Sequence, residues 1–261
     1  MSAHFTLYTL LAAAGLSLVM LGLFTLGSRA ADRRIALTPD HAAPDGGVVN
    51  GSVFGLLGLL VAFTFSGAAS RFDNRRELIT KEVNAIGTAW MRIDMLPTGA
   101  QPAIRDGFRR YLDARIGVYA KLPDEAAARR ELKRSLDEQA DLWAKAVAVC
   151  RTDSGAPARM LLLPTMNEMF DLAEERTVNI RMHPPAVIWL MLILLALVAS
   201  LLAGYAMPTS KQRNWLHILA FIGTTAIAVY VIADLEYPRR GLIQVKDFDQ
   251  IMVDLRTSMG N

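Results

Sequence analysis

The fold is decided by the stretch FGLLGLLVAFTFSGAASRFDNRRELITKEVNAIGTAWMRIDMLP, residues 54–97. It begins inside an uncharged apolar run, 48–69, and continues into a polar segment. Apolar residues recur in that polar segment at alternating steps of four and three, the period of a helix with one buried face: Ile79, Val83, Ile86, Trp90 and Ile93. The pattern predicts one unbroken helix that leaves the membrane and ends at Pro97.

Three further apolar runs accompany the first, so the chain is predicted to cross a membrane four times. The runs are Phe5–Leu26, Val48–Ala69, Ala186–Met207 and Trp215–Ala233, each of 19 to 22 residues and without aspartate, glutamate, lysine or arginine. At about 1.5 Å per residue they extend for roughly 28 to 33 Å, the thickness of the hydrocarbon core of a bilayer. A buried core helix would explain one such run but not four.

Composition excludes several classes of protein. The chain is 52% hydrophobic and 20% charged with a net charge of +3, and the charges lie outside the four runs. No basic stripe with interleaved aromatic residues indicates a nucleic-acid partner. The one cysteine, Cys150, and four scattered histidines indicate neither a disulfide nor a metal site. No catalytic motif is present, so we expect no enzyme activity, no catalytic residue and no cofactor.

Lysine and arginine near the runs predict the orientation. One side of the membrane receives Arg29, Arg33, Arg34, Lys211 and Arg213. The other side receives Arg71, Arg75, Arg76, Lys81, Arg176, Arg181, Arg239, Arg240 and Lys246. The larger number predicts that both termini and the central region lie in the cytoplasm. An exported central region is the alternative. The sequence does not decide whether the loop 28–47, with Asp40 and Pro44, is ordered or flexible.

The polar region between the second and third runs is predicted to be helical throughout, which makes the whole chain all-α. We expect membrane helices in 1–70, a cytoplasmic helical domain in 71–183, membrane helices in 184–235 and a cytoplasmic tail in 236–261. Small residues at helical spacing are predicted to let spans pack closely: Gly51, Gly55 and Gly58 in the second run, and Ala196, Ser200 and Gly204 in the third. The pattern does not say whether these contacts lie within one chain or between chains. Ser52, Thr64 and Ser66 either bond to backbone one turn back or touch water in a pore.

Four segments together resemble the bacterial bestrophin-like domain family. They are residues 54–97, LLLPTMNEMFDLAEER (161–176), HPPAVIWLMLILLALVASLLAGYAM (183–207) and DLEYPRRGLIQV (234–245). The family is in turn distantly similar to the bestrophins, and that resemblance implies a pentameric anion channel with four membrane helices per subunit and a cytosolic helical domain.

The resemblance also implies site residues. Laying Ala69 and Ser70 on the Ala-Ser of the bestrophin segment places Leu57, Val61 and Phe65 at the narrow neck of the pore. Residues four apart form a stripe on a helix, so a ring of these side chains would gate by excluding water. The alternative is that the stripe faces lipid or a neighbouring helix.

Charged residues around the second span have two interpretations as well. Arg71, Arg75 and Arg76 either attract anions at the pore exit or anchor the helix at the membrane surface. A structural polar network is predicted from Asp73, Glu82, Asn167, Glu168, Asp171, Asp234, Arg239 and Arg240, in which the turn after the fourth span braces Asp73 or Glu82. No acidic cluster of the calcium-binding kind is evident.

Two functions follow from these patterns. The first is an oligomeric channel in the lipid bilayer, a pentamer by resemblance, that passes chloride-type inorganic anions passively through a path lined by the second span. The second is a non-conducting membrane protein whose central helices bind a cytosolic partner. Oligomer number separates them, because a dimer would exclude the pentameric channel.

Overall fold

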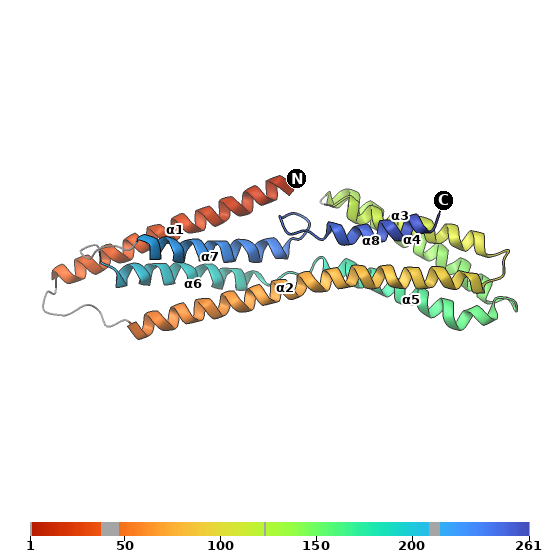
Figure 1. Cartoon of the computed structure of the whole chain (residues 1–261), viewed down its shortest axis with the longest axis horizontal. Helices are drawn as coiled ribbons and strands as arrows, with labels where there is room; N and C mark the ends of the chain where they lie inside the picture. Colours follow the sequence, from red (N-terminus) through yellow and green to blue (C-terminus); the bar gives the residue numbers. More distant parts are fainter. Residues whose placement is uncertain (1, 38–46, 123, 209–214, 261) are drawn as a thin grey trace. The chain divides into compact units, whose positions relative to one another are not determined.

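The computed structural model describes residues 2–37, 47–122, 124–208 and 215–260. Within these ranges the chain is helical and contains no strand, which confirms the predicted all-helical fold. Figure 1 shows the helices in chain order. They are α1 (Ser2–Leu37), α2 (Gly47–Arg92), the 3-10 helix η1 (Ile93–Met95), α3 (Gln101–Ala120), α4 (Glu125–Cys150), α5 (Ala156–Asn179), α6 (Ala186–Ala206), α7 (Trp215–Glu236) and α8 (Lys246–Ser258).

Four of these helices, α1, α2, α6 and α7, are long and apolar enough to cross a membrane. α1 and α2 continue well beyond their apolar runs, to Leu37 and Arg92. The predicted helix that leaves the membrane without a break is therefore α2, a single element of 46 residues. The predicted topology signals Lys211 and Arg213, and the loop residues Asp40 and Pro44, lie outside the described residues.

The chain divides into two compact units that α2 joins. Residues 1–72 and 183–242 form the first, called here the span unit, and residues 73–182 and 243–261 form the second, called the domain unit. The span unit contains α1, the apolar part of α2, α6 and α7. The domain unit contains the polar part of α2, η1, α3, α4, α5 and α8.

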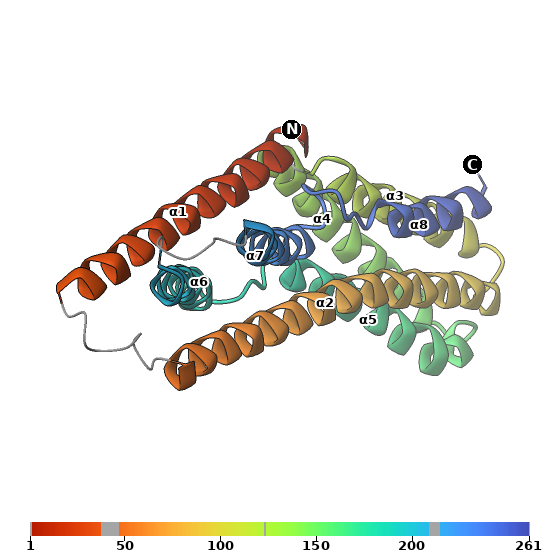
Figure 2. The ribbon, with the colours of Figure 1, turned by 60° about the vertical axis from the view of Figure 1, so that its left-hand side comes forward.

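In the span unit α1 packs against both α6 and α7, as Figure 2 shows. Met20 and Phe24 of α1 are buried, and their carbonyl groups contact Ser200 and Gly204 of α6. Small residues allow this close approach of the two helices. A Cβ added at Gly204 would collide with the carbonyl oxygen of Phe24, and one added at Gly27 would collide with that of Leu201. Glycine therefore brings the two backbones into direct contact.

The domain unit is a helical bundle in which α3 packs on α4, α4 on α5, and α8 on α3. Local sequence signals start its helices, because a proline lies in the first turn of α3 and of α5, and Asp124 caps α4 by accepting a hydrogen bond of 3.0 Å from the amide of Ala127. The predicted stripe of α2 faces the core, where Ile79, Val83 and Ile86 are buried. The core also holds Phe108, Tyr111, Leu112, Leu142, Met166 and Met169.

Candidate functional site

Within the span unit, α2 has one exposed side and one covered side. Leu59 and Phe63 are 52% and 68% exposed, whereas Leu57 is 4% exposed. Residues three or four positions apart share a side of a helix, so the exposed residues Leu59, Phe63, Ser66 and Ser70 form one strip, called here the open face. One chain leaves the open face without protein cover, which makes it available to a second chain, to lipid or to a water-filled path.

The three residues predicted for a pore neck run from the covered side of α2 to the exposed side. Leu57 is buried, Val61 is half-buried and Phe65 is 44% exposed. Each step of four residues turns a side chain by about 40° around the helix, so the eight residues from Leu57 to Phe65 turn it by about 80°. Leu57 is therefore packed within its own chain, whereas Phe65 is only partly covered by it.

The predicted small-residue faces lie in different surroundings. Gly51, Gly55 and Gly58 are exposed, and a Cβ built on any of them meets no atom within 4 Å. On α6, by contrast, the predicted small residues are buried in the contact with α1: Ala196, Ser200 and Gly204. The hydroxyl of Ser200 donates a hydrogen bond of 2.7 Å to the carbonyl of Met20.

The first of the three predicted anion-attracting arginines is bound to a carboxylate in the span unit. The Nε of Arg71 donates to Oε1 of Glu236 at 2.7 Å, and Nη2 donates to the same oxygen. The side chain of Glu236 is 1% exposed, and its Oε2 lies 3.5 Å from Nδ1 of His183, whose ring stacks on Tyr237 with centroids 4.7 Å apart. The ion pair neutralises Arg71 and joins the end of α7 to α2.

The other two arginines are also held by the protein, in the domain unit. Arg75 is 6% exposed and donates a hydrogen bond of 2.9 Å from Nη2 to the carbonyl of Met182. The guanidinium of Arg76 lies over the ring of Phe248, 4.3 Å from its centroid, and Nη1 is 3.2 Å from Asp73. The three arginines therefore serve first as contacts within the chain.

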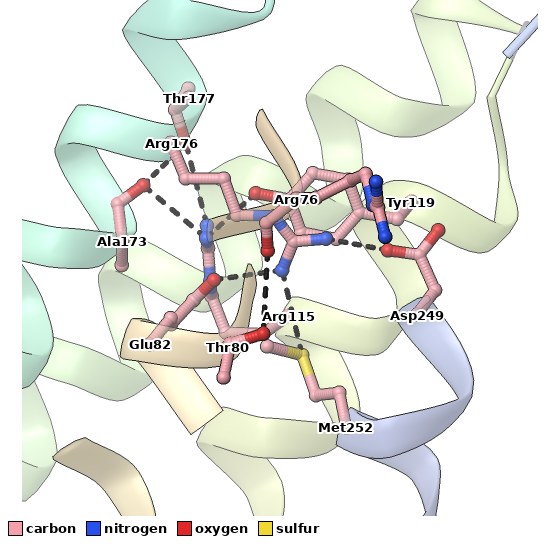
Figure 3. Close-up of polar contacts among 10 residues, drawn as sticks. All are labelled: Arg76, Thr80, Glu82, Arg115, Tyr119, Ala173, Arg176, Thr177, Asp249 and Met252. Carbon is pink, nitrogen blue, oxygen red and sulfur yellow. Dashed lines mark hydrogen bonds and ion pairs between the residues drawn. The ribbon is translucent and has the colours of Figure 1, made fainter. Parts of the chain in front are cut away.

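A buried ion cluster lies at the centre of the domain unit, where α2, α3 and α5 meet (Figure 3). Glu82 is fully buried and accepts from Nε of Arg115 at 2.7 Å and from Nη1 of Arg176 at 2.8 Å. Burial alone would raise the pKa of Glu82, but the charges of Arg115 and Arg176 outweigh it and hold the pKa below its ordinary value. Glu82 is therefore ionised at neutral pH and shared by two guanidinium groups.

The same two arginines extend the cluster to α8 and to a tyrosine of α3. Arg115 donates to the hydroxyl of Tyr119 at 2.8 Å and to the carbonyl of Ala173 at 3.3 Å. Arg176 donates to Oδ1 of Asp249 at 2.6 Å and lies 3.6 Å from the centre of the Tyr119 ring (Figure 3). A chain of charges thus fastens the C-terminal helix to the core of the domain unit.

The remaining residues of the predicted polar network are placed separately. Asn167, Glu168 and Asp171 are exposed on α5, so an interhelical role for them stays a prediction. Asp234 is buried at the end of α7, where its Oδ1 accepts a hydrogen bond of 2.9 Å from the amide of Leu242 and shapes the turn.

The expectation that this turn braces the first cytoplasmic helix, through Asp73 or Glu82, stays a prediction. Glu82 pairs with Arg115 and Arg176, and Asp73 pairs with Arg76 within α2. Arg239 and Arg240 lie half-buried in the turn itself.

Arg115 and Arg176 are the residues that the sequence patterns missed. A basic residue is normally assigned to the surface, and neither was considered as a partner of Glu82. The missed signal is their register, because each stands at helical spacing among apolar residues. These are Phe108, Leu112 and Tyr119 around Arg115 on α3, and Met169 and Ala173 on α5 with Ile180 directly after it around Arg176. A charged residue at a position that faces the core needs a buried partner of the opposite sign, because an unpaired buried charge is costly.

Among the described residues no group of histidine, cysteine and acidic side chains is arranged to hold a metal ion. Cys150, at the end of α4, is 1% exposed, and burial raises the pKa of its thiol. The candidate functional features among the described residues are therefore the charge pairs and the exposed apolar side of α2.

Comparison with known proteins gives the same fold. Residues 14–248 match the family model described as the Bestrophin-like domain. A bacterial bestrophin homologue from Klebsiella pneumoniae, solved as a point mutant, superposes with a TM-score of 0.67 at 12% identity, over 97% of this chain and 99% of that one. A second mutant of that homologue gives a TM-score of 0.68 at 14% identity, over 94% and 97% of the two chains. No curated protein matches the sequence.

Proposed function

The chain belongs to the bestrophin-like family, as its resemblance indicated, and from this premise we propose that it is an oligomeric channel for inorganic anions. In the proposal it lies in the inner membrane of a bacterium, with the termini and the domain unit in the cytoplasm. Ions move passively down their gradient, and no reaction is catalysed. A pentamer, implied by the resemblance to bestrophins, surrounds the path.

The observation that carries the proposal is the open face of α2. A helix that lines a path must present side chains that its own subunit does not cover, and Leu59 and Phe63 meet this condition. Ser66 and Ser70 follow on the same side and offer hydroxyl donors to an anion. The order from apolar to hydroxyl residues suits a narrow barrier followed by a wider polar mouth.

The exposure of α2 favours a particular register for the neck. Leu57, Val61 and Phe65 remain the neck predicted from the resemblance, but Leu57 is 4% exposed and would have to leave its packing to line a path. Leu59 and Phe63 are also four residues apart, and both are exposed in the single chain. We therefore place the apolar constriction at Leu59 and Phe63, where a ring of such side chains excludes water until it widens.

The second candidate, a non-conducting interaction or sensory protein, rests on the exposed glycines of α2. Gly51, Gly55 and Gly58 leave room for another helix to approach closely, and such packing would close the helix pair to ions. In that arrangement the domain unit would bind a cytosolic partner. Absence of ion flux from inserted protein favours this function.

Chloride efflux from liposomes that contain the purified protein tests the proposal. Three variants are compared with the wild type: Leu59→Ala/Phe63→Ala, Leu57→Ala/Val61→Ala/Phe65→Ala, and the control Leu190→Ala/Leu194→Ala, which removes exposed leucines from α6. We expect faster efflux in the first variant, because shorter side chains at the constriction leave a wider path. We expect unchanged efflux in the control. A larger effect in the Leu57 variant returns the neck to the stripe predicted from the resemblance. No efflux from any sample, with insertion verified, contradicts the channel.

A further inference from the structure

One side of α1 is exposed along its length and changes from apolar residues to arginines. The residues of this side, called here the α1 strip, follow one another at steps of four, four, three and four: Leu18, Gly22, Leu26, Arg29 and Arg33. Such steps keep side chains on one side of an α-helix. All five residues are exposed, with Leu18 and Leu26 at 70% and 54%.

The packed side of α1 lies opposite the α1 strip. A helix turns by about 100° per residue, so the buried residues Met20, Phe24 and Ala31 lie about 160° to 200° around the helix from Gly22. Because α1 packs on α6 and α7 through that buried side, the α1 strip is left for a partner outside the chain.

Gly22 leaves the surface of the helix bare between two leucines. A Cβ added there meets no atom within 4 Å, whereas Leu18 and Leu26, about one turn before and after it, are exposed side chains. A hydrocarbon chain that lies over Gly22 contacts both leucines. The two arginines begin about 4.5 Å beyond Leu26 along the helix axis, where the apolar run has ended.

The two arginines of the α1 strip carry charges that the chain does not neutralise. Among the residues that the structure describes, neither Arg29 nor Arg33 forms an ion pair or a hydrogen bond. Arg34 differs from them, because it donates a hydrogen bond of 2.7 Å to the hydroxyl of Tyr205. Like charges four residues apart on a helix repel one another, so an anion bound between Arg29 and Arg33 would be stabilising.

The span unit of a second copy is poorly suited to supply that anion. The described acids of the span unit are Asp32, Asp234 and Glu236, and all three already interact within their own chain. A phospholipid supplies both partners of the α1 strip in one molecule, because its charged head group follows directly on its acyl chains. Arginine is also well suited to a phosphate group, which it binds through parallel N–H donors.

We propose that the α1 strip binds an anionic phospholipid. The phosphate group lies between Arg29 and Arg33, and an acyl chain lies over Gly22 between Leu18 and Leu26. The inference goes beyond the proposed channel function and does not rest on it, because α1 would hold the lipid whether or not the chain conducts ions.

Native mass spectrometry of the purified protein in detergent tests this binding site. The protein is titrated with dioleoyl phosphatidylglycerol, which is anionic, or with dioleoyl phosphatidylcholine, which is zwitterionic, and we expect the wild type to bind the anionic lipid more tightly. Arg29→Gln/Arg33→Gln should weaken its binding roughly fivefold for each arginine removed, the usual effect of one basic residue at an anionic lipid surface. Arg29→Lys/Arg33→Lys keeps both charges and should retain most of the binding.

A further variant leaves every charge in place. Gly22→Leu fills the space between the two leucines and should also weaken the binding of phosphatidylglycerol, which a change in net charge could not explain. Its control is Gly223→Leu on α7, where an added Cβ likewise meets no atom within 4 Å. The control for the arginine variant is Arg130→Gln/Arg151→Gln, which removes two exposed arginines from the domain unit.

Equal binding of phosphatidylglycerol by the wild type and by Arg29→Gln/Arg33→Gln would overturn the inference. Equal losses in the arginine variant and its control would do so too, because net charge alone would then attract the lipid. The inference also fails if Gly22→Leu binds the lipid as the wild type does, or if excess glycerol 3-phosphate, which has no acyl chain, displaces it. Chloride efflux is measured separately, so failure of the channel function leaves the binding result intact.

Discussion

At the scale of single residues, the charge that most affects stability is the buried carboxylate of Glu82. Burying an ion is costly, and this cost is offset only while both guanidinium groups remain in place. Because Arg115 and Arg176 come from α3 and α5, one carboxylate on α2 links three helices. The stability of the domain unit therefore depends on keeping this carboxylate ionised between its two arginines.

Replacing this carboxylate should destabilise the protein strongly. Glu82→Gln leaves two buried guanidinium groups without a counter-charge, and removing one partner of such a group costs about 3 kcal/mol or more. The free energy of unfolding, measured in detergent by urea titration of tryptophan fluorescence, should fall by this amount. Glu77→Gln, which breaks an exposed pair on the same helix, is the control and should change the stability little. Equal effects of the two substitutions would contradict a buried cluster.

The lowered pKa of Glu82 predicts that the fold loses stability in acid. The pKa of Glu82 is lower in the folded chain than in the unfolded chain, so the folded state binds the proton less readily. Its stabilisation is complete above the unfolded pKa of about 4.3 and is lost as the pH falls through the lower folded value. The urea midpoint, followed from pH 7 to pH 3, should drop more steeply in the wild type than in Glu82→Gln. Parallel curves would show that other carboxylates dominate.

Residue patterns in the sequence could locate Glu82 but not its partners. Glu82 was included in a predicted network as a candidate partner of the turn after the fourth span. Its partners Arg115 and Arg176 are 33 and 94 residues away in sequence. Pairing across such separations depends on which helix faces pack together, and periodicity within one helix carries no information about that.

At the scale of helices, the contact between α1 and α6 depends on glycine at points where backbones touch. Ser28 donates a hydrogen bond of 3.1 Å to the carbonyl of Gly204, and Ser200 bonds in the opposite direction to Met20. Side-chain to backbone bonds of this kind require a separation that no larger residue at position 204 permits. The two helices thus hold each other through polar groups inside an apolar layer.

A side chain at position 204 should therefore separate these helices. Gly204→Val places a Cβ against the carbonyl group of Phe24 and adds two methyl groups to it, and overpacking of this kind typically costs about 1 to 3 kcal/mol. We expect a lower midpoint of thermal unfolding in detergent and a smaller yield of monodisperse protein. Gly15→Val, on a part of α1 where an added Cβ meets nothing within 4 Å, serves as the control. Similar losses for both variants would point to helix propensity as the cause.

Helix existence could be predicted from the sequence, whereas helix contacts could not. The four spans were evident because a run such as Ala186–Met207 satisfies the length and apolarity that a bilayer requires. The C-terminal extent of α1, which reaches Leu37 instead of ending near Leu26, was not evident, because hydropathy marks the lipid layer and not the end of the hydrogen-bond ladder. That Arg71, Arg75 and Arg76 contact their own chain could also not be predicted from the sequence. These contacts depend on where the fold places Glu236, Met182 and Phe248.

At the scale of the whole molecule, the exposed side of α2 is suited to a ring of subunits, and the resemblance to bestrophins predicts that there are five. An open face that carries Leu59 and Phe63 is suited to a closed ring in which each subunit presents the same strip to the axis. Native mass spectrometry of the protein released from detergent should show a pentamer. A dimer would be incompatible with such a ring and would support the interaction protein instead.

The burial of the chain's one thiol has a chemical consequence for the assembled protein. Cys150 is 1% exposed, and its raised pKa keeps it in the unreactive protonated form at neutral pH. The natural protein should therefore react very slowly with water-soluble thiol reagents. A cysteine introduced at any position of α2 would then react alone, so that the rate of its modification reports, residue by residue, where water touches the helix.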